Sequence, residues 1–347
     1  EGQAGPLNHQ DSARTPLDAK ISLQHADLAS TGFVDSSSGL AGNLDFDGTL
    51  KSDGRQIRSE GKAKAGNLRV LKDGAPAKAP VSLDYHSEYG LESEKGTLSS
   101  QIHTGKSTLD AGGNLDTRGE DTIAHLKIQG KNMAVNDIQA LLPAFGVVLP
   151  AGASLQGGTV NMDMTAEGPL DRLVITGPLT VSETRLTGYD LGSKLGALSA
   201  LTGLKPSTET LIKTASSGLR VAPEGIRADN ILLDVPAIGS LTGSGVIGSN
   251  NSLDFKMLLK VSSTAGSLLG SLGSVSTALE KKGVPFLIQG TTQNPKFLPA
   301  LGKAGLADTL LGAAQGKQGD QANTQNQQKQ DLKGILGGIL KKKKPQQ

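Results

Sequence analysis

The sequence predicts a mainly β protein whose strands form one long antiparallel sheet with a single apolar face. Polar and apolar residues alternate along most of the chain from Leu17 onward, as expected for strands that bury one side. Gly, Pro, Asn or Asp interrupts the alternation at intervals of roughly eight to twelve residues, which is typical of many short strands. Only 3% of the 347 residues are aromatic and none is Trp, so we expect a thin core.

Residues 1–16 are polar and show no pattern, and we expect them to form a flexible lead-in. From there the alternation places Leu17, Ala19, Ile21 and Leu23 on one face, and residues 40–48 repeat it after a Ser-rich turn. The breaks that follow contain Asp-Gly and Gly-Gly pairs, which favour tight turns between antiparallel strands. We therefore expect residues 17–312 to form one sheet region rather than several domains.

Helical signals are few and short. Asn136-Asp137 is a candidate N-cap for a helix over 136–145 that ends near a proline. Leucines recur at three- and four-residue spacing over 191–204 and again over 267–282, which predicts two amphipathic helices. Residues 313–330 are rich in Gln and Asn and are expected to be a disordered linker. Residues 331–347 are expected to form an amphipathic, polybasic tail.

The composition excludes several classes of function. The formal net charge is +2, and the four lysines near the end of the chain exceed it, so the body is close to neutral and does not suit nucleic-acid binding. The absence of cysteine excludes disulfides, thiolate zinc sites and a cysteine nucleophile. No run approaches the roughly 18 apolar residues that span a bilayer. The chain starts at Glu1, which fits either a processed protein or a piece of a longer one.

Short motifs that resemble catalytic or cofactor sites are better explained as turns. Residues 243–248 match G-x-G-x-x-G, but the sequence after them reads as turn and strand rather than helix. Gly105-Lys106-Ser107 resembles the end of a phosphate-binding loop, again without a following helix. The five histidines show no metal-ligand spacing, and no G-x-S-x-G motif occurs. We therefore expect neither an enzyme nor a bound cofactor or metal.

The end of the chain combines a short apolar face with a cluster of positive charge. Apolar pairs about one helical turn apart precede four lysines, and such a segment can rest on an anionic bilayer. The alternative is a solvated, disordered end, because Gly337-Gly338 weakens a helix there. The candidate membrane-contact residues are Ile335, Leu336, Ile339, Leu340, Lys341, Lys342, Lys343 and Lys344.

Two longer stretches resemble the C-terminal region of the AsmA family of bacterial envelope proteins. They are AEGPLDRLVITGPL at 166–179 and PFLIQGTTQNPKFLP at 285–299, and the resemblance covers residues 110–301, and 21–105 more loosely. The resemblance implies a curved β-groove, a location at the periplasmic face of the inner membrane, and an N-terminal membrane anchor that this chain lacks. It also implies a role in outer-membrane homeostasis and in moving phospholipid between the two membranes.

A sheet whose apolar face is not covered by a second layer must cover that face with something else. Phospholipid acyl chains are one solution, and the leucine-rich helices completing an ordinary core are the other. A non-enzymatic scaffold for outer-membrane protein assembly, which recruits envelope proteins along its sheet edges, is the alternative function. The groove-lining candidates come from the best-patterned strands and are Leu173, Ile175, Leu232, Val235, Phe255 and Leu258.

Overall fold

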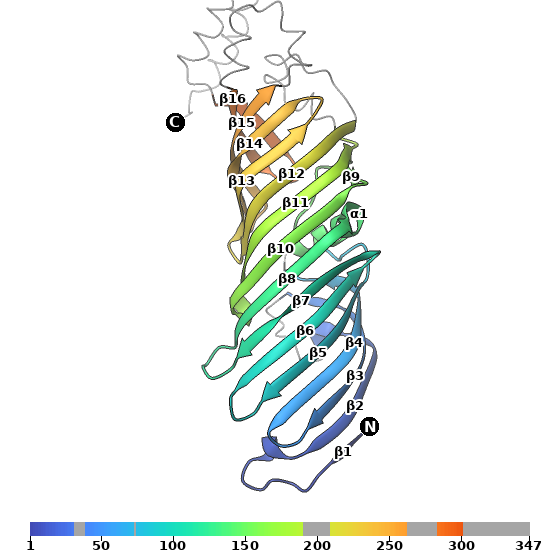
Figure 1. The fold of residues 1–347 in the computed structure, drawn as a ribbon. Coiled ribbons are helices and arrows are strands. Elements are labelled where there is room, and N and C mark those ends of the chain that lie inside the picture. Colours follow the sequence, from blue (N-terminus) through green and yellow to red (C-terminus); the bar gives the residue numbers. More distant parts are fainter. Residues whose placement is uncertain (31–38, 73, 190–208, 262–282, 301–347) are drawn as a thin grey trace, which may run out of the picture.

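The computed structural model describes residues 1–30, 39–72, 74–189, 209–261 and 283–300. These residues form a single 17-stranded sheet, long and curved, in which the strands follow one another obliquely from the N-terminal to the C-terminal end (Figure 1). The predicted fold class, a long and open antiparallel sheet with little helix, is confirmed.

Sixteen of the strands are joined as an antiparallel meander. In chain order the strands are β1 (Gly2–Ala4), β2 (Leu17–Asp27), β3 (Ala41–Ser52), β4 (Gln56–Arg69), β5 (Val81–Gly90), β6 (Lys95–Thr104), β7 (Ser107–Asp116), β8 (Ile123–Ala134), β9 (Ser154–Gln156), β10 (Thr159–Pro169), β11 (Val174–Thr187), β12 (Glu209–Ala222), β13 (Gly225–Val235), β14 (Gly239–Gly248), β15 (Ser252–Val261), β16 (Val284–Thr291) and β17 (Pro295–Pro299). The short β9 extends β10 along the same side of β11. Among the described residues β1 pairs only with β2 and β17 only with β16, so these two strands are the edges.

The two long rims of the sheet differ. On the hairpin rim tight turns join β3 to β4, β5 to β6, β12 to β13, β14 to β15 and β16 to β17. On the opposite rim, the long-loop rim, short turns join β6 to β7 and β13 to β14, and the other connections are longer. The connection after β8 holds the helix α1 (Val135–Leu141) with the 3-10 turn η4 (Leu142–Phe145). Shorter 3-10 turns are η1 (Ser12–Arg14), η2 (Leu28–Ser30) and η5 (Leu170–Arg172).

Four bulges recur on strands that run in the same direction. The residues are His25 in β2, Asn67 in β4, Asn132 in β8 and Asn230 in β13, each with φ between 50° and 52° next to a shift in pairing. At a bulge, one backbone N–H loses its carbonyl partner in the neighbouring strand. At two of the four bulges a side-chain oxygen accepts the hydrogen bond from that N–H instead. His25 N–H donates to Asp45 Oδ1 and Asn132 N–H donates to Asn161 Oδ1, both at 2.8 Å. Because bulges increase local twist, this row bends the sheet along its length.

Full burial of apolar side chains is confined to the middle and the C-terminal end. One cluster of buried residues, Met133, Val135 and Val160, joins α1 to β8 and β10. The larger cluster joins the ends of β13–β16 and contains Val235, Ile238, Leu241, Met257, Leu259, Val284 and Phe286. By contrast, the buried residues of β2–β7 are Gly96, Ser100, Thr104 and Ser107, with no hydrophobic residue among them.

Several predicted elements can be compared with these boundaries. The helix expected over 136–145 corresponds to α1 and η4, but Asn136 and Asp137 do not cap it, because the N-cap is Ala134 without a side-chain bond. Within the lead-in expected at 1–16, Gly2–Ala4 forms a short strand that pairs with β2. Residues 243–248 lie in β14, as a strand rather than a phosphate loop. The helices predicted at 191–204 and 267–282, the linker at 313–330 and the tail at 331–347 lie outside the described residues.

Candidate functional site: the apolar face

The strands place apolar side chains in continuous rows on one face of the sheet. Residues that are direct partners in neighbouring strands share a face. One row of such partners runs from β2 to β11 without a charged residue: Leu23, Phe46, Ala63, Leu83, Ile102, Leu109, Gly130, Met162 and Leu179. We call this side the apolar face and the opposite side the polar face.

The hydroxyl groups on the apolar face are occupied by bonds within the sheet. Ser59 Oγ and Tyr85 OH lie 2.8 Å apart, and Ser100 Oγ donates to the carbonyl of Ala111 at 2.8 Å. Ser87 Oγ donates to the carbonyl of Ser59. A hydroxyl that already has a partner costs less to cover with an apolar group than one that loses water. The face therefore behaves as an apolar surface despite its serines.

A small aromatic ledge lies within this face. The rings of Phe46 and Tyr85 stack with centroids 6.1 Å apart and planes at 23°. Beneath them Gly48 and Gly61 are direct cross-strand partners. A Cβ on Gly48 would lie 2.6 Å from Cζ of Phe46, and one on Gly61 would lie 3.1 Å from Cε1 of Tyr85. The glycines are therefore what allows the rings to lie flat on the sheet.

The polar face carries exposed ion pairs between neighbouring strands. Examples are Lys51–Asp18 at 3.4 Å, Arg58–Glu88 at 3.2 Å, Lys62–Asp84 at 3.4 Å, Lys127–Asp163 at 3.5 Å and Arg185–Glu209 at 3.2 Å. Pairs this exposed contribute about 0–1 kcal/mol each. Their main consequence is that they keep this face of the sheet in water, which leaves the opposite face for apolar contacts.

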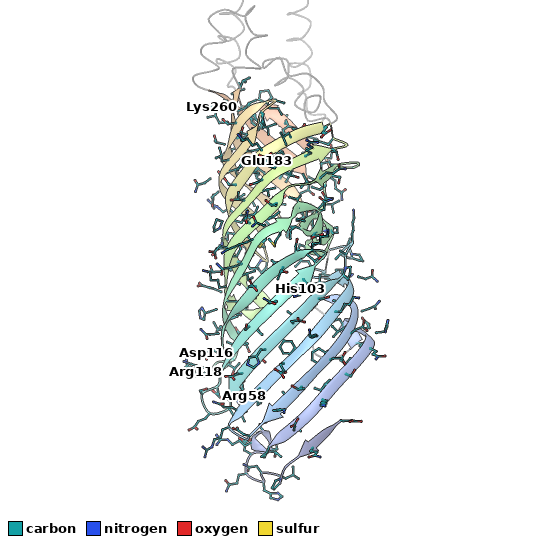
Figure 2. All side chains as sticks on the ribbon, turned by 45° about the vertical axis from the view of Figure 1, so that its right-hand side comes forward. Arg58, His103, Asp116, Arg118, Glu183 and Lys260 are labelled. Carbon is teal, nitrogen blue, oxygen red and sulfur yellow. The ribbon has the colours of Figure 1, made fainter. Side chains whose placement is uncertain are left out.

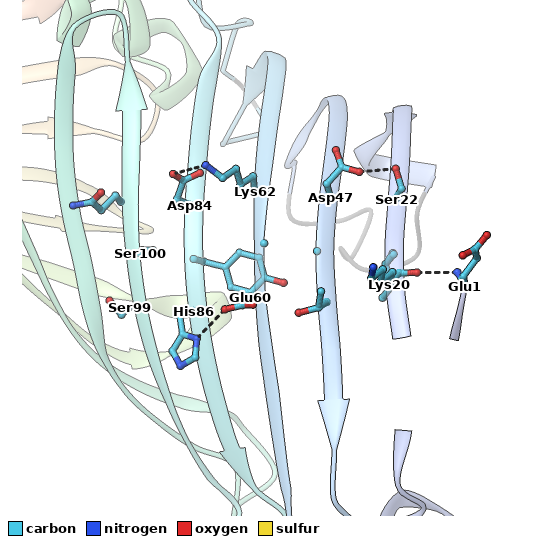
Figure 3. Close-up of a pocket in the computed structure, with 16 residues that line it drawn as sticks. Glu1, Lys20, Ser22, Asp47, Glu60, Lys62, Asp84, His86, Ser99 and Ser100 are labelled. Atoms are coloured by element: carbon cyan, nitrogen blue, oxygen red, sulfur yellow. Dashed lines mark hydrogen bonds and ion pairs between the residues drawn. The ribbon is translucent and has the colours of Figure 1, made fainter. Parts of the chain in front are cut away.

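An open depression of about 990 Å³ crosses β2–β6 between two rows of polar side chains (Figure 3). One row of its lining contains Asp47, Lys62 and Asp84, the other contains Thr49, Glu60 and His86, and Gly48, Gly61 and Tyr85 lie between the rows. Both rows belong to the polar face, so the depression opens on that side. His86 lies 3.9 Å from Glu60 and 3.7 Å from Glu88. No group of three His, Cys, Asp or Glu suited to a metal ion occurs in the described part of the chain. The depression is a shallow, solvated surface of mixed charge.

Carboxylates at the hairpin rim have lowered pKa values for structural reasons. Hydrogen bonds from the Arg118 guanidinium hold the pKa of Asp116 well below its ordinary value of 3.8 (both residues are labelled in Figure 2). The backbone N–H of Gln56 lowers the pKa of Asp53, and the Arg220 side chain lowers that of Glu224. These shifts keep the groups ionised at neutral pH, which suits turn-forming carboxylates and gives no proton donor.

The structure separates the six predicted lining residues. Ile175, Val235 and Phe255 lie on the apolar face, where Val235 is fully buried and Phe255 packs against the C-terminal cluster. Leu173 is half-buried in the connection before β11. Leu232, 44% exposed, and Leu258 are partners of Thr242 on the polar face. The bulge at Asn230 reverses which side of the sheet the following residues of β13 face, and no alternation in the sequence reveals such a reversal.

The prediction missed the residues of the N-terminal half that expose the most continuous apolar surface. Phe46, Ala63, Leu83 and Ile102 are half-buried members of the long apolar row. In the sequence these four residues alternate with polar or charged neighbours, and this pattern could have identified them. The tail residues from Ile335 to Lys344 lie outside the described residues.

Comparison with protein-family models, with curated proteins and with solved structures found no match. No helix within the described ranges has the length and hydropathy needed to cross a membrane. The sheet and its two faces therefore carry the functional argument.

Proposed function

We propose that the apolar face binds phospholipid acyl chains, and that the protein is an AsmA-like module that moves phospholipid between the inner and outer membranes from the periplasmic face of the inner membrane. The observation that carries the proposal is the apolar row from Leu23 to Leu179. It crosses nine strands, and none of its members in β2–β7 is buried. The predicted tail, Ile335 to Lys344, is proposed as an additional membrane contact.

The chemistry of this face suits hydrocarbon chains better than a protein partner. Covering it with acyl chains gains about 0.8 kcal/mol per buried methylene. The small side chain of Ala63 leaves space for a chain next to the larger Phe46 and Leu83, and it imposes no fixed shape. The occupied hydroxyls offer few free donors to a polar ligand. No covalent step is needed, since binding and release along the face suffice for transport.

The test compares neighbouring residues on opposite faces of β4. Ala63 lies on the apolar face between Phe46 and Leu83, whereas Lys64 is exposed on the polar face. Lipid that copurifies with the chain from a bacterial envelope is extracted and quantified by mass spectrometry. We expect wild type and Lys64→Glu to carry phospholipid, and Ala63→Glu to carry several-fold less, because a charge in an apolar site is costly to desolvate.

Circular dichroism checks that both variants keep the sheet. Wild-type protein without bound phospholipid, or equal lipid in the two variants, would refute the proposal. Headgroup analysis of the same extracts identifies which phospholipid is bound.

The alternative, a scaffold for outer-membrane protein assembly, is favoured by one observation. The edge strand β17 pairs on one side only within the described chain, so its other side can accept a strand from a partner. Proline at both ends of β17 limits such pairing. A stoichiometric protein partner recovered with lipid-free protein would favour this function over lipid binding.

A further inference from the structure

The polar face changes character at its C-terminal end. Leu232 in β13, Leu258 in β15, and Leu287 and Leu298 in β16 and β17 all lie on it, together with Thr242 and Pro285. Leu232 and Leu298 are 44% and 41% exposed. A depression of about 410 Å³ lies beside them, and its lining is mainly apolar. Thr242, Leu258, Pro285 and Leu287 line it, together with Lys256 and Ala300. We call the four leucines, Thr242 and Pro285 the C-terminal patch.

The patch does not belong to the core on the other side of the same strands. Phe286 and Met257 point into the buried C-terminal cluster, and their neighbours Leu287 and Leu258 point the opposite way. These strands therefore carry leucines on both faces, unlike β2–β8, whose polar face carries mainly charged and hydroxyl side chains. Apolar side chains on a solvent-exposed face that no core requires mark an interaction surface.

Lysines that form no ion pair within the described ranges surround and interrupt the patch. Lys256 and Lys260 flank Leu258 on the exposed side of β15, and Lys296 precedes Leu298 by two residues on β17. None of these three forms an ion pair with a described residue; Lys260 is labelled at the C-terminal end of the sheet in Figure 2. Two carboxylates, Asp234 and Asp254, lie at the margin of the patch, where Lys213 in β12 adds a fourth positive charge.

We propose that the C-terminal patch docks on the surface of an anionic phospholipid bilayer. Lysine and leucine alternate on this face, so the aliphatic side chains can enter the boundary of the acyl region while the ammonium groups extend to the lipid phosphates. Phe286, the aromatic residue that lines the depression, is only 1% exposed, and no arginine lines it. Accessible aromatic and arginine side chains are the usual anchors of a protein interface. A bilayer surface requires neither such anchors nor a fixed alignment of individual contacts. This favours a bilayer over an acidic protein as the partner.

This docking surface goes beyond the proposed transport function, because it lies on the face opposite the acyl-binding row. It would hold the C-terminal end of the sheet against a membrane with the apolar face free to load or release lipid. The two proposals also fail separately. Ala63→Glu, which should empty the apolar face, leaves the patch intact and should not change docking.

The test is flotation of the purified full chain with vesicles of phosphatidylcholine alone and of phosphatidylcholine with phosphatidylglycerol. The patch variants are a charge reversal, K256E/K260E/K296E, and a polar replacement, L232S/L258S/L298S. The matched control, K20E/K64E/K131E, makes the same charge change at exposed lysines of β2, β4 and β8 that have no leucine patch around them. All variants keep the C-terminal lysines.

We expect wild type and the control to float with the anionic vesicles and to bind neutral vesicles weakly. Charge reversal in the patch should weaken binding roughly tenfold or more, since each surface lysine contributes measurably to anionic binding. The leucine variant should lose binding as well, which a purely electrostatic contact would not do. Absence of wild-type binding, equal losses in patch and control, or capture of an acidic protein partner without vesicle binding would each overturn the proposal. Circular dichroism confirms that each variant is folded.

Discussion

At the scale of single residues, the apolar face depends on where side chains are missing. Gly48 and Gly61 face each other across β3 and β4, and the rings of Phe46 and Tyr85 cover them. Rings that lie flat over paired glycines fill the space that two side chains would occupy, and they keep the surface smooth. The Ser59 contact with the Tyr85 hydroxyl fixes the second ring in this position.

Gly61→Ala should therefore destabilise the protein, because the new Cβ would lie 2.7 Å from the carbonyl oxygen of Asp47 and 2.9 Å from Cα of Gly48. Backbone atoms cannot move aside easily, so we expect a loss of about 1–3 kcal/mol in the free energy of unfolding. Gly66→Ala in the same strand is the control, since nothing lies within 4 Å of its Cβ position. It should stabilise by about 0.5–1 kcal/mol through lower unfolded-chain entropy. Urea denaturation measures both, and similar losses in the two variants would refute the explanation.

At the scale of elements, α1 is held to the sheet by side chains rather than by its own cap. Asp137 accepts hydrogen bonds from the N–H of Lys106 and the hydroxyl of Ser107, both at 2.8 Å. Ser107 Oγ in turn accepts from the N–H of Ala134 at the start of the helix. The sequence pattern indicated a capping residue here, but the carboxylate binds the β6–β7 turn, which is adjacent only in the folded chain.

Asp137→Ala should remove this connection and leave the nearly buried Ser107 hydroxyl without its acceptor. We expect a loss of about 1–3 kcal/mol, as is usual for a hydrogen bond to a charged group. Glu92→Ala, in the exposed β5–β6 turn, is the control and should change stability by no more than about 0.5 kcal/mol. Thermal unfolding followed by circular dichroism provides the comparison. An unchanged melting temperature for Asp137→Ala would show that the network does not secure the helix.

At the scale of the whole molecule, each strand packs mainly on its immediate neighbours, as in a repeat protein. The two ends differ in packing, because a buried cluster closes β13–β16 while β2–β7 have no buried hydrophobic residue. Stability should therefore vary along the sheet, and a destabilising substitution should affect mainly the strands next to it.

Phe286→Ala tests this at the centre of the C-terminal cluster, where Phe286 is 1% exposed. The cavity should cost about 3–5 kcal/mol. Hydrogen exchange measured by mass spectrometry should show faster exchange in β13–β17 and unchanged protection in β2–β8. A uniform loss of protection along all strands would mean that the sheet unfolds as one cooperative unit, contrary to this prediction.

The sequence by itself determined the strands, because alternation and turn residues are local signals that each hairpin satisfies alone. It also determined the helix near residue 136 and the presence of one apolar face. It did not determine which leucines share that face. Leu232 and Phe255 alternate equally well, yet the Asn230 bulge places Leu232 on the opposite side.

Only the tertiary structure decided which part of the apolar face is covered and which is open. Burial depends on what a curved sheet brings close together, and residues far apart in the chain make that decision. The same alternation that builds the closed cluster around Phe286 leaves Phe46 and Leu83 half-exposed. Period-two patterning specifies the side of a strand on which a residue lies, whereas curvature and neighbouring elements specify what that side meets.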